Sequence, residues 1–153
     1  MIKMATVQEI RVRDVMSPAV VTLPASCTVR QASQVLFEAR VTGAPVLGSG
    51  ERVLGIVSHS DLLDPRHDDA PDTPILDVMT RVVFAVRADD PLAWAIRLMV
   101  DERVHRVIVA DDEGRLAGIV VPMDVLRAMV PSSPLPSSLV YSYVDLRGSE
   151  GDG

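Results

Sequence analysis

The strongest constraint on the fold of this chain is an internal repeat. When the chain is laid on itself, Val12–Leu63 aligns with Ile75–Leu126 without a gap. Identical residues recur from one end of the alignment to the other and include the pairs Asp14/Asp77, Val15/Val78, Met16/Met79, Arg40/Arg103, Gly55/Gly118, Asp61/Asp124 and Leu63/Leu126. A copy of about 52 residues buries too little surface to be stable alone. We therefore expect two copies that pack on each other and share a core.

Both copies predict the same order of elements: an extended stretch, a helix, two strands joined by a turn, and a second helix. Apolar residues spaced i, i+3 and i+7 indicate the helices, and β-branched runs beside Gly- or Asp-rich turns indicate the strands. The fold class that we predict is α/β (α+β), with two βαββα repeats packed sheet to sheet. Copy one is expected to have an extended stretch at Ala19–Leu23, a helix from Val29, strands at Ala44–Leu47 and Arg52–Ser58, and a helix at Ser60–Leu63. In copy two the matching elements are Val82–Val86, a helix from Leu92, Val107–Ala110, Leu116–Val121 and Pro122–Met129.

The duplication divides the chain into five segments. The repeats are residues 12–63 and 75–130, and the polar, proline-containing stretch 64–74 links them. Residues 1–11 form a short N-terminal segment, and residues 131–153 form a C-terminal tail.

Composition excludes several functions. The chain has 15 Lys and Arg against 21 Asp and Glu, a formal charge of −6, and its aromatic content is 3%. An acidic chain with few rings lacks both the basic field and the stacking platforms of a nucleic-acid-binding surface. The single cysteine, Cys27, cannot form an intrachain disulfide and suits a reducing compartment. No stretch approaches the roughly 18 apolar residues of a membrane span, so we expect a cytoplasmic protein.

No catalytic or metal-binding set is evident. His59, His67 and His105 lack the spacing of metal ligands, and no phosphate-binding glycine loop is present. Cys27 lies near a helix start, where a thiolate is favoured, but it aligns with Asp90, which we expect to cap the longer helix of copy two ahead of Pro91. Cys27 is thus better interpreted as a capping-region residue. We expect no enzyme activity, no metal and no required cofactor.

The clearest signal for a ligand site lies where the last strand of copy one ends, at Ser58 and Asp61. Backbone N–H groups at a helix start face outward, and a serine hydroxyl there can bond a phosphate or ribose oxygen. A carboxylate three residues later repels phosphate but can accept both hydroxyls of a ribose diol. The spacing therefore predicts a nucleoside site. A plain capping motif, with Ser58 as N-cap and Asp61 completing it, explains the same spacing.

At these residues the chain resembles a tandem pair of CBS (cystathionine-β-synthase) domains, a Bateman module. The resemblance covers about Val12–Val130. It is carried by Asp-Val-Met-Ser at 14–17, Asp-Val-Met-Thr at 77–80, Thr-Gly-Ala-Pro-Val at 42–46, Arg103–Val109, both Gly-Ile-Val runs and the aspartates at 61 and 124.

The resemblance implies two repeats related by a pseudo-twofold axis, and two clefts that bind adenine nucleotides or S-adenosylmethionine. It places a ligand between the first extended stretch and the last strand of one repeat. Carried over by position, Ser17, Val20 and Val21 would border the adenine, Ser58 would meet phosphate or ribose, and Asp61 the ribose diol. The resemblance also implies that His105 and Arg106 supply positive charge to phosphates, in some modules from the partner of a dimer; a surface pair on a strand is the alternative.

Copy two departs from this pattern. Val121 stands where the hydroxyl residue belongs, and Pro122 follows it. A ligand oxygen left without that hydroxyl costs about 1–3 kcal/mol. The resemblance leaves a weaker second site at Thr80, Val83, Phe84 and Asp124. We expect the first cleft to be the better site and the second to be weak or empty.

The leading hypothesis is a stand-alone regulatory module. It would form a homodimer, bind AMP, ADP, ATP or S-adenosylmethionine, and signal to a partner protein whose identity the residues do not reveal. One alternative is a ligand-independent dimerisation or scaffold module, which Val121 and the Thr42–Gly43 pair favour, since the latter stands where a second His-Arg pair would be. Another is a trans-acting regulator of a separate enzyme, such as IMP dehydrogenase, or of a transporter.

Overall fold

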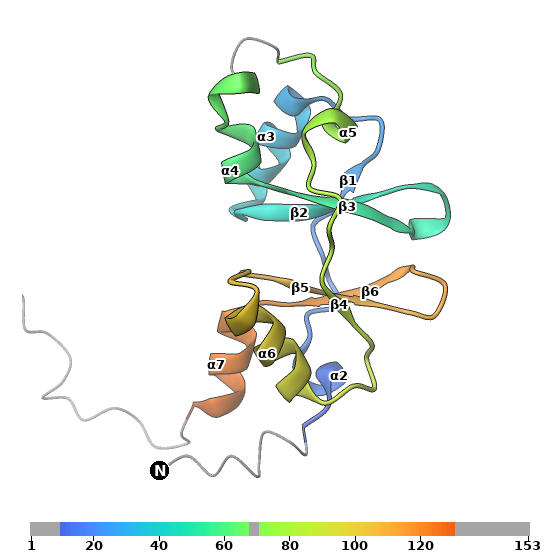
Figure 1. The fold of residues 1–153 in the computed structure, drawn as a ribbon, viewed down its shortest axis with the longest axis vertical. Coiled ribbons are helices and arrows are strands. Elements are labelled where there is room, and N and C mark those ends of the chain that lie inside the picture. The colour runs from blue at the N-terminus through green and yellow to red at the C-terminus, as the bar shows by residue number, and fades with distance from the viewer. Residues whose placement is uncertain (1–9, 68–70, 131–153) are drawn as a thin grey trace, which may run out of the picture.

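The computed structural model describes residues 10–67 and 71–130, and it shows two three-stranded sheets stacked face to face with helices on their outer sides (Figure 1). This arrangement confirms the mixed fold of two βαββα repeats packed through their sheets. The elements in chain order are α2 Val12–Val15, β1 Leu23–Pro24, α3 Val29–Ala39, β2 Gly43–Leu47, β3 Val53–Ser58, α4 His59–Leu62, α5 Ile75–Val78, β4 Ala85–Val86, α6 Leu92–Asp101, β5 Val107–Ala110, β6 Leu116–Val120 and α7 Pro122–Met129, with short 3-10 turns at Ser49–Glu51 and Pro65–His67.

Both sheets have the same topology. In the first sheet β1 is parallel to β2, and β2 is antiparallel to β3; β4, β5 and β6 repeat this order. Ala44 and Val46 on β2 belong to the core beneath α3, whereas Pro45 between them is buried outside that core. Ile108 is the matching residue of β5. Because neighbouring side chains on a strand point to opposite faces, Pro45 and Ile108 lie where the sheets meet.

The two copies exchange their opening segments. The core of the second sheet contains Val12 from α2, a copy-one residue that is fully buried, and the core of the first sheet contains the fully buried Ile75 from α5 of copy two. Neither core is therefore built from one repeat alone, although the duplication in the sequence runs from 12 to 63 and from 75 to 130. Figure 1 shows the result: α2 lies beside α6 and α7 in the lower half of the molecule, while α5 lies in the upper half.

Backbone hydrogen bonds hold each exchanged segment against the start of the opposite long helix. The N–H of Val12 donates to the carbonyl of Asp90 (2.9 Å), and that of Leu92 donates to the carbonyl of Ile10 (2.8 Å). The other exchange repeats both bonds, from Ile75 N–H to Cys27 and from Val29 N–H to Thr73, each at 2.9 Å. Each long helix thus gains an acceptor for its first N–H from the residues just before the opposite copy, Ile10 and Thr73.

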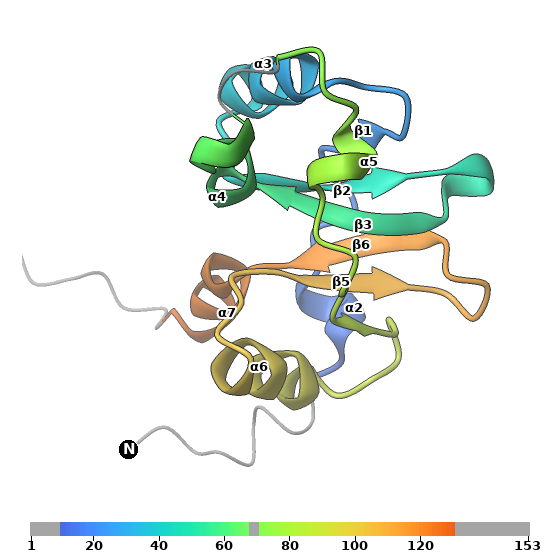
Figure 2. The same ribbon diagram turned by 45° about the horizontal axis from the view of Figure 1, so that its top comes forward.

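After each exchanged segment the chain pairs with the last strand of the opposite sheet. Ser17 and Ile119 exchange two backbone bonds, of 2.9 and 3.0 Å, and Thr80 and Ile56 do the same at 2.8 and 2.9 Å. Figure 2 shows β3 and β6 next to each other where the sheets meet, and the N–H of Val53 donates to the carbonyl of Gly114 there (3.1 Å).

Helix ends follow local chemistry in copy one. Thr28 caps α3 through a reciprocal pair of bonds with Gln31, of 3.0 and 3.3 Å. The shorter α4 ends before Pro65, since proline disfavours the helical conformation in the residue that precedes it. Its counterpart α7 has no proline at the matching position and continues to Met129.

The expectation for the start of α6 is wrong, and the extended stretches contain only short strands. Asp90 does not cap α6: its carboxylate accepts a bond from the N–H of Arg87 (2.8 Å), and Pro91 occupies the N-cap position rather than the first helical position. The exchanged segment explains this, because Ile10 accepts the first helical N–H. The stretches at 19–23 and 82–86 form strands only at Leu23–Pro24 and Ala85–Val86. The bridges to the other sheet are made by Ser17 and Thr80, which precede these stretches.

The crossing points are too tight for a side chain. A Cβ built at Gly55 would lie 2.7 Å from both the sulfur of Met79 and the backbone oxygen of Thr80. At Gly118, the equivalent position, a Cβ would lie 2.9 Å from the sulfur of Met16 and 3.0 Å from the oxygen of Ser17. Glycine is therefore required wherever an exchanged strand passes over the sheet.

We expect Gly55→Ala to lower the free energy of unfolding by about 1–3 kcal/mol, because the clash involves backbone that cannot move without breaking the Ile56–Thr80 pairing. Urea denaturation measures this. The matched control is Gly48→Ala, whose Cβ would meet only the side-chain end of Leu54, at 3.0 Å. Equal effects of both substitutions would contradict the tight crossing.

Candidate functional site

Two pockets lie where the chain, after each exchanged segment, pairs with the last strand of the opposite sheet. Each pocket is lined by residues from both copies. The Ser58 pocket has a volume of about 440 Å³ and the Ser17 pocket about 370 Å³. The Ser58 pocket is lined by Ile56, Ser58 and Asp61 of copy one and by Thr80, Val82, Phe84 and Arg103 of copy two. The Ser17 pocket is lined by Ser17, Val20, Val21 and Arg40 of copy one and by Ile119, Val121 and Asp124 of copy two.

This division corrects the expected grouping of site residues. Ser17, Val20 and Val21 do not join Ser58 and Asp61 in one cleft, because the exchange carries their stretch to the other sheet. Each pocket therefore combines the strand-end residues of one copy with the extended stretch of the other.

The residues expected for the weaker site are divided as well. Thr80 and Phe84 join Ser58 and Asp61, whereas Asp124 joins Ser17. Val83 lines neither pocket. Its neighbours Val82 and Phe84 line the Ser58 pocket, and successive side chains of an extended chain point to opposite sides.

Asp61 organises the polar end of the Ser58 pocket. Its Oδ2 accepts bonds from the backbone N–H of Ser58 (2.8 Å) and from the Ser58 hydroxyl (3.1 Å), and its Oδ1 accepts one from the Thr80 hydroxyl (3.4 Å). The Ser58 hydroxyl also lies 3.0 Å from that of Ser60. The carboxylate is only half-buried, so it caps the helix start while one side remains open to the pocket. The capping interpretation is correct, and it leaves the pocket lining intact.

Asp124 is held more tightly in the Ser17 pocket. It is 6% exposed, and it accepts bonds from the N–H of Val121 (3.0 Å) and the hydroxyl of Ser17 (3.4 Å). Arg127 adds a salt bridge of 3.5 Å. Val121 brings no hydroxyl, so this pocket offers a ligand fewer free polar groups than the other.

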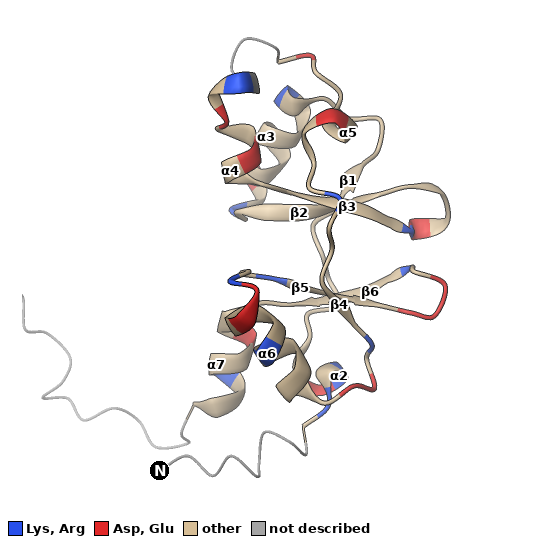
Figure 3. Cartoon of the chain, viewed as in Figure 1, with Lys and Arg blue, Asp and Glu red and all other residues tan. Residues whose placement is uncertain are grey.

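Three residues, Thr42, His105 and Arg106, line both pockets. Arg106 is half-buried, and its Nη2 donates to the hydroxyl of Thr42 (2.7 Å). Its guanidinium lies against Gly43, where a Cβ would be 2.6 Å from Nη1. Burial lowers the pKa of Arg106 below its usual value, and the negative charge of Asp61 partly opposes this. Figure 3 shows basic positions at the starts of β2 and β5, on the side of the molecule where α4 and α7 begin.

The family model for the CBS domain matches residues 12–67 and 75–131, which is most of the chain. The chain belongs to the CBS domain family. Over 108 residues it is 32% identical to the inosine-5'-monophosphate dehydrogenase of Methanocaldococcus jannaschii, covering 71% of this chain and 21% of that enzyme. The chain spans under half the length of several further curated relatives that it matches.

Solved structures support this membership. The CBS-pair protein CBSX2 of Arabidopsis thaliana, solved in complex with AMP, is 30% identical with a TM-score of 0.70, over 78% of this chain and 95% of that one. The CBS domain pair of protein MJ0100, solved with 5'-methylthioadenosine and S-adenosyl-L-methionine, has a TM-score of 0.69 at 23% identity, over 78% and 95% of the two chains. The second likeness shows the fold alone.

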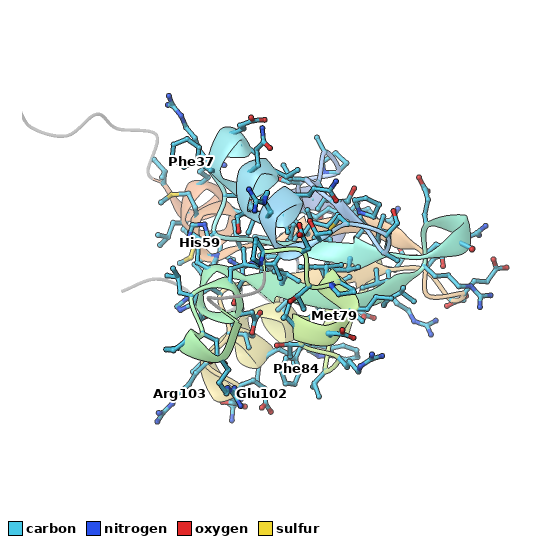
Figure 4. All side chains as sticks on the ribbon, turned by 90° about the horizontal axis from the view of Figure 1, so that it is seen from above. Phe37, His59, Met79, Phe84, Glu102 and Arg103 are labelled. Atoms are coloured by element: carbon cyan, nitrogen blue, oxygen red, sulfur yellow. The ribbon has the colours of Figure 1, made fainter. Side chains whose placement is uncertain are left out.

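Several residues of the CBS pair's pockets were not predicted. Arg40 and Arg103 line one pocket each, at identical positions of the two copies, and both have left-handed backbones (φ 55° and 53°). A non-glycine residue is uncommon in this region. The signal that the sequence offered is the identical arginine at this position of both copies. Ile56 and Ile119 form a second unpredicted pair. Figure 4 shows Phe84 and Arg103, two members of the Ser58 pocket, on the same side of the molecule.

Three further features of the described residues of the CBS pair concern metal binding, the Cys27 thiol and membrane-spanning helices. In residues 10–67 and 71–130 no three His, Cys, Asp or Glu side chains gather where they could hold a metal ion. Cys27 is buried, and burial raises the pKa of its thiol, which disfavours a reactive thiolate. No helix of the described segments is long and apolar enough to cross a membrane.

We expect Asp124→Ala to lower the free energy of unfolding by about 1–3 kcal/mol and Asp61→Ala to lower it by less. Removing the buried Asp124 carboxylate leaves the N–H of Val121 without an acceptor. Asp61 is half-buried, so water can replace its carboxylate as the acceptor for the groups that donate to it. Chemical denaturation of both variants checks this order. A larger loss in Asp61→Ala would contradict the burial argument.

Proposed function

We propose that this CBS pair is a regulatory module that binds an adenosine nucleotide in the Ser58 pocket and signals its occupancy to a partner protein. One observation carries the proposal: Asp61 and Arg106 line the same pocket without forming a salt bridge to each other. A carboxylate and a guanidinium held apart in this way match the ribose diol and the phosphate of a nucleotide, one group for each.

The remaining lining residues suit the other parts of such a ligand. Ile56, Val82 and Phe84 give an apolar wall for the base, and the Ser58 and Thr80 hydroxyls lie beside the carboxylate that would accept the ribose hydroxyls. CBSX2, whose structure contains AMP, is the relative that supports this class of ligand.

Charge favours a phosphorylated ligand over S-adenosylmethionine. Arg103 and Arg106 both line the Ser58 pocket, and His105 lies beside them. The two guanidinium groups attract phosphate and repel a sulfonium group. We therefore place AMP, ADP and ATP ahead of S-adenosylmethionine for this pocket.

The test is a thermal-shift series with AMP, ADP, ATP and S-adenosylmethionine. We expect at least one phosphorylated ligand to raise the melting temperature of the wild type, since a ligand at 100 times its Kd stabilises by about 2.7 kcal/mol. Asp61→Ala should lose most of that shift. The matched control, Asp77→Ala, removes an exposed carboxylate outside both pockets and should keep it.

The outcomes separate the candidate functions. A wild type that responds to none of the four compounds, or a shift of equal size in Asp61→Ala, rules out the ribose assignment. A chain that binds none of them and still self-associates would instead be the ligand-independent scaffold that Val121 and the Thr42–Gly43 pair favour.

We also propose that the module acts as a homodimer through its helices. Large apolar side chains are exposed at equivalent places in both copies: Phe37 (82%) and Val100 (67%) on the long helices, and Leu63 (73%) and Leu126 (56%) after or within the short ones. Figure 4 shows Phe37 at the edge of the molecule, pointing outward. A matched pair of apolar faces suits a symmetric association.

We expect the double variant Phe37→Glu, Val100→Glu to sediment as a monomer at concentrations where the wild type is a dimer. The control, Leu54→Gln, changes an exposed apolar residue on β3, away from the helices, and should leave the dimer unchanged. Analytical ultracentrifugation measures both. A dimer that persists in the double variant would place the interface elsewhere.

A further inference from the structure

The two pockets share one set of central residues, and this set is not symmetric. Thr42, His105 and Arg106 line both pockets. The repeat pairs Thr42 with His105 and Gly43 with Arg106, so a fully symmetric centre would hold two histidines and two arginines. Only one half of that set is present, and Gly43 provides the space into which the Arg106 guanidinium extends.

Each pocket also has an arginine of its own, Arg103 in one and Arg40 in the other. Both are exposed, and the interactions of exposed charges are weakened by water and salt. Arg106 differs because it is half-buried and belongs to no salt bridge among the described residues. Among the described residues, this half-buried cation has a compensating negative charge only from Asp61, which lies more than 4 Å away.

We propose that the two pockets compete for Arg106, so that a phosphorylated nucleotide in the Ser58 pocket weakens the binding of a second phosphorylated nucleotide in the Ser17 pocket. The proposal rests on the proposed function, and it adds a rule on ligand charge. One CBS pair binds one phosphorylated nucleotide well, and its Ser17 pocket is then left for an uncharged nucleoside.

The physical reason is that one guanidinium cannot compensate two phosphates. A hydrogen bond to a charged group contributes about 1.5–3 kcal/mol, so losing it weakens binding at least about tenfold. The phosphate already bound adds repulsion between like charges across the shared residues. Binding free energies are linked, so a phosphate in the Ser17 pocket weakens the Ser58 pocket by the same factor. An uncharged nucleoside has no phosphate, so it neither needs the Arg106 guanidinium nor is repelled by the bound phosphate.

Each pocket contains one isoleucine, so methyl NMR can follow the pockets separately in the full chain. Ile56 reports on the Ser58 pocket and Ile119 on the Ser17 pocket. The variant Ser60→Trp plugs only the Ser58 pocket: Ser60 is exposed, lines that pocket alone and carries no charge. Its matched control is Met123→Trp, at the equivalent position of copy two, where the side chain is 52% exposed and lines neither pocket.

We expect Ser60→Trp to raise the affinity of AMP for the Ser17 pocket at least about tenfold over wild type, as read from Ile119, and to leave the affinity of adenosine unchanged. Met123→Trp should behave as wild type. In an Arg106→Gln background the plug should no longer change AMP binding at Ile119. If Arg106→Gln does not fold, the comparison of wild type with Ser60→Trp stands by itself. An Ile56 signal that no longer responds to AMP shows that Ser60→Trp blocks the Ser58 pocket. If Ile56 still responds, Val82→Trp is used as the blocking variant instead.

Two failures can be told apart. If AMP moves the Ile56 signal in wild type but the plug leaves AMP affinity at Ile119 unchanged, or changes AMP and adenosine alike, the competition is wrong and the proposed function stands. If AMP, ADP and ATP leave Ile56 unmoved in wild type, the proposed function is wrong, and the competition falls with it.

Discussion

The exchange of opening segments between the two copies is the interaction on which the rest of the structure depends. Val12 and Ile75 are fully buried in cores that belong mainly to the other copy, and the N–H groups of Leu92 and Val29 find their acceptors in Ile10 and Thr73. A single copy would leave an open core and unsatisfied helix starts, both of which are costly. Each copy therefore depends on the other for a closed core and for satisfied helix starts.

The same exchange explains why some of the fold could be predicted from the sequence and some could not. The repeat, the hairpins and α7 depend on local periodicity and turn residues, and the structure has them where expected. Which copy receives Ser17 or Thr80 is decided by pairing with Ile119 or Ile56, more than 20 residues away in either case. No local pattern encodes that choice, so Ser17 was grouped with Ser58 when its partner is Asp124. The prediction that Asp90 caps α6 is wrong for the same reason, because Ile10, distant in sequence, accepts the first helical N–H.

The two pockets show how equivalent positions have diverged. The aspartates at 61 and 124 begin the same kind of helix and accept the same backbone bond, at 2.8 and 3.0 Å. Their surroundings differ: Asp124 is buried under Arg127 and has no serine at Val121, while Asp61 is half-open and has Ser58. The sequence predicted this difference in polar groups correctly, because it depends on residue types alone. The exposure of Asp61 depends on packing and required the structure.

A ligand in either pocket would act on the relation between the copies rather than on one of them. The Ser58 pocket has Ser58 and Asp61 on one side, from copy one, and Phe84 and Arg106 on the other, from copy two. Any molecule that bonds both sides adds free energy only while the sheets keep their present packing, and so it stabilises that packing against alternatives. Pro45 and Ile108 lie at the contact between the sheets, and the crossing glycines bring the two backbones close together there. Arg106, which lines both pockets, is placed to make the effect of a ligand on this packing depend on the ligand's charge.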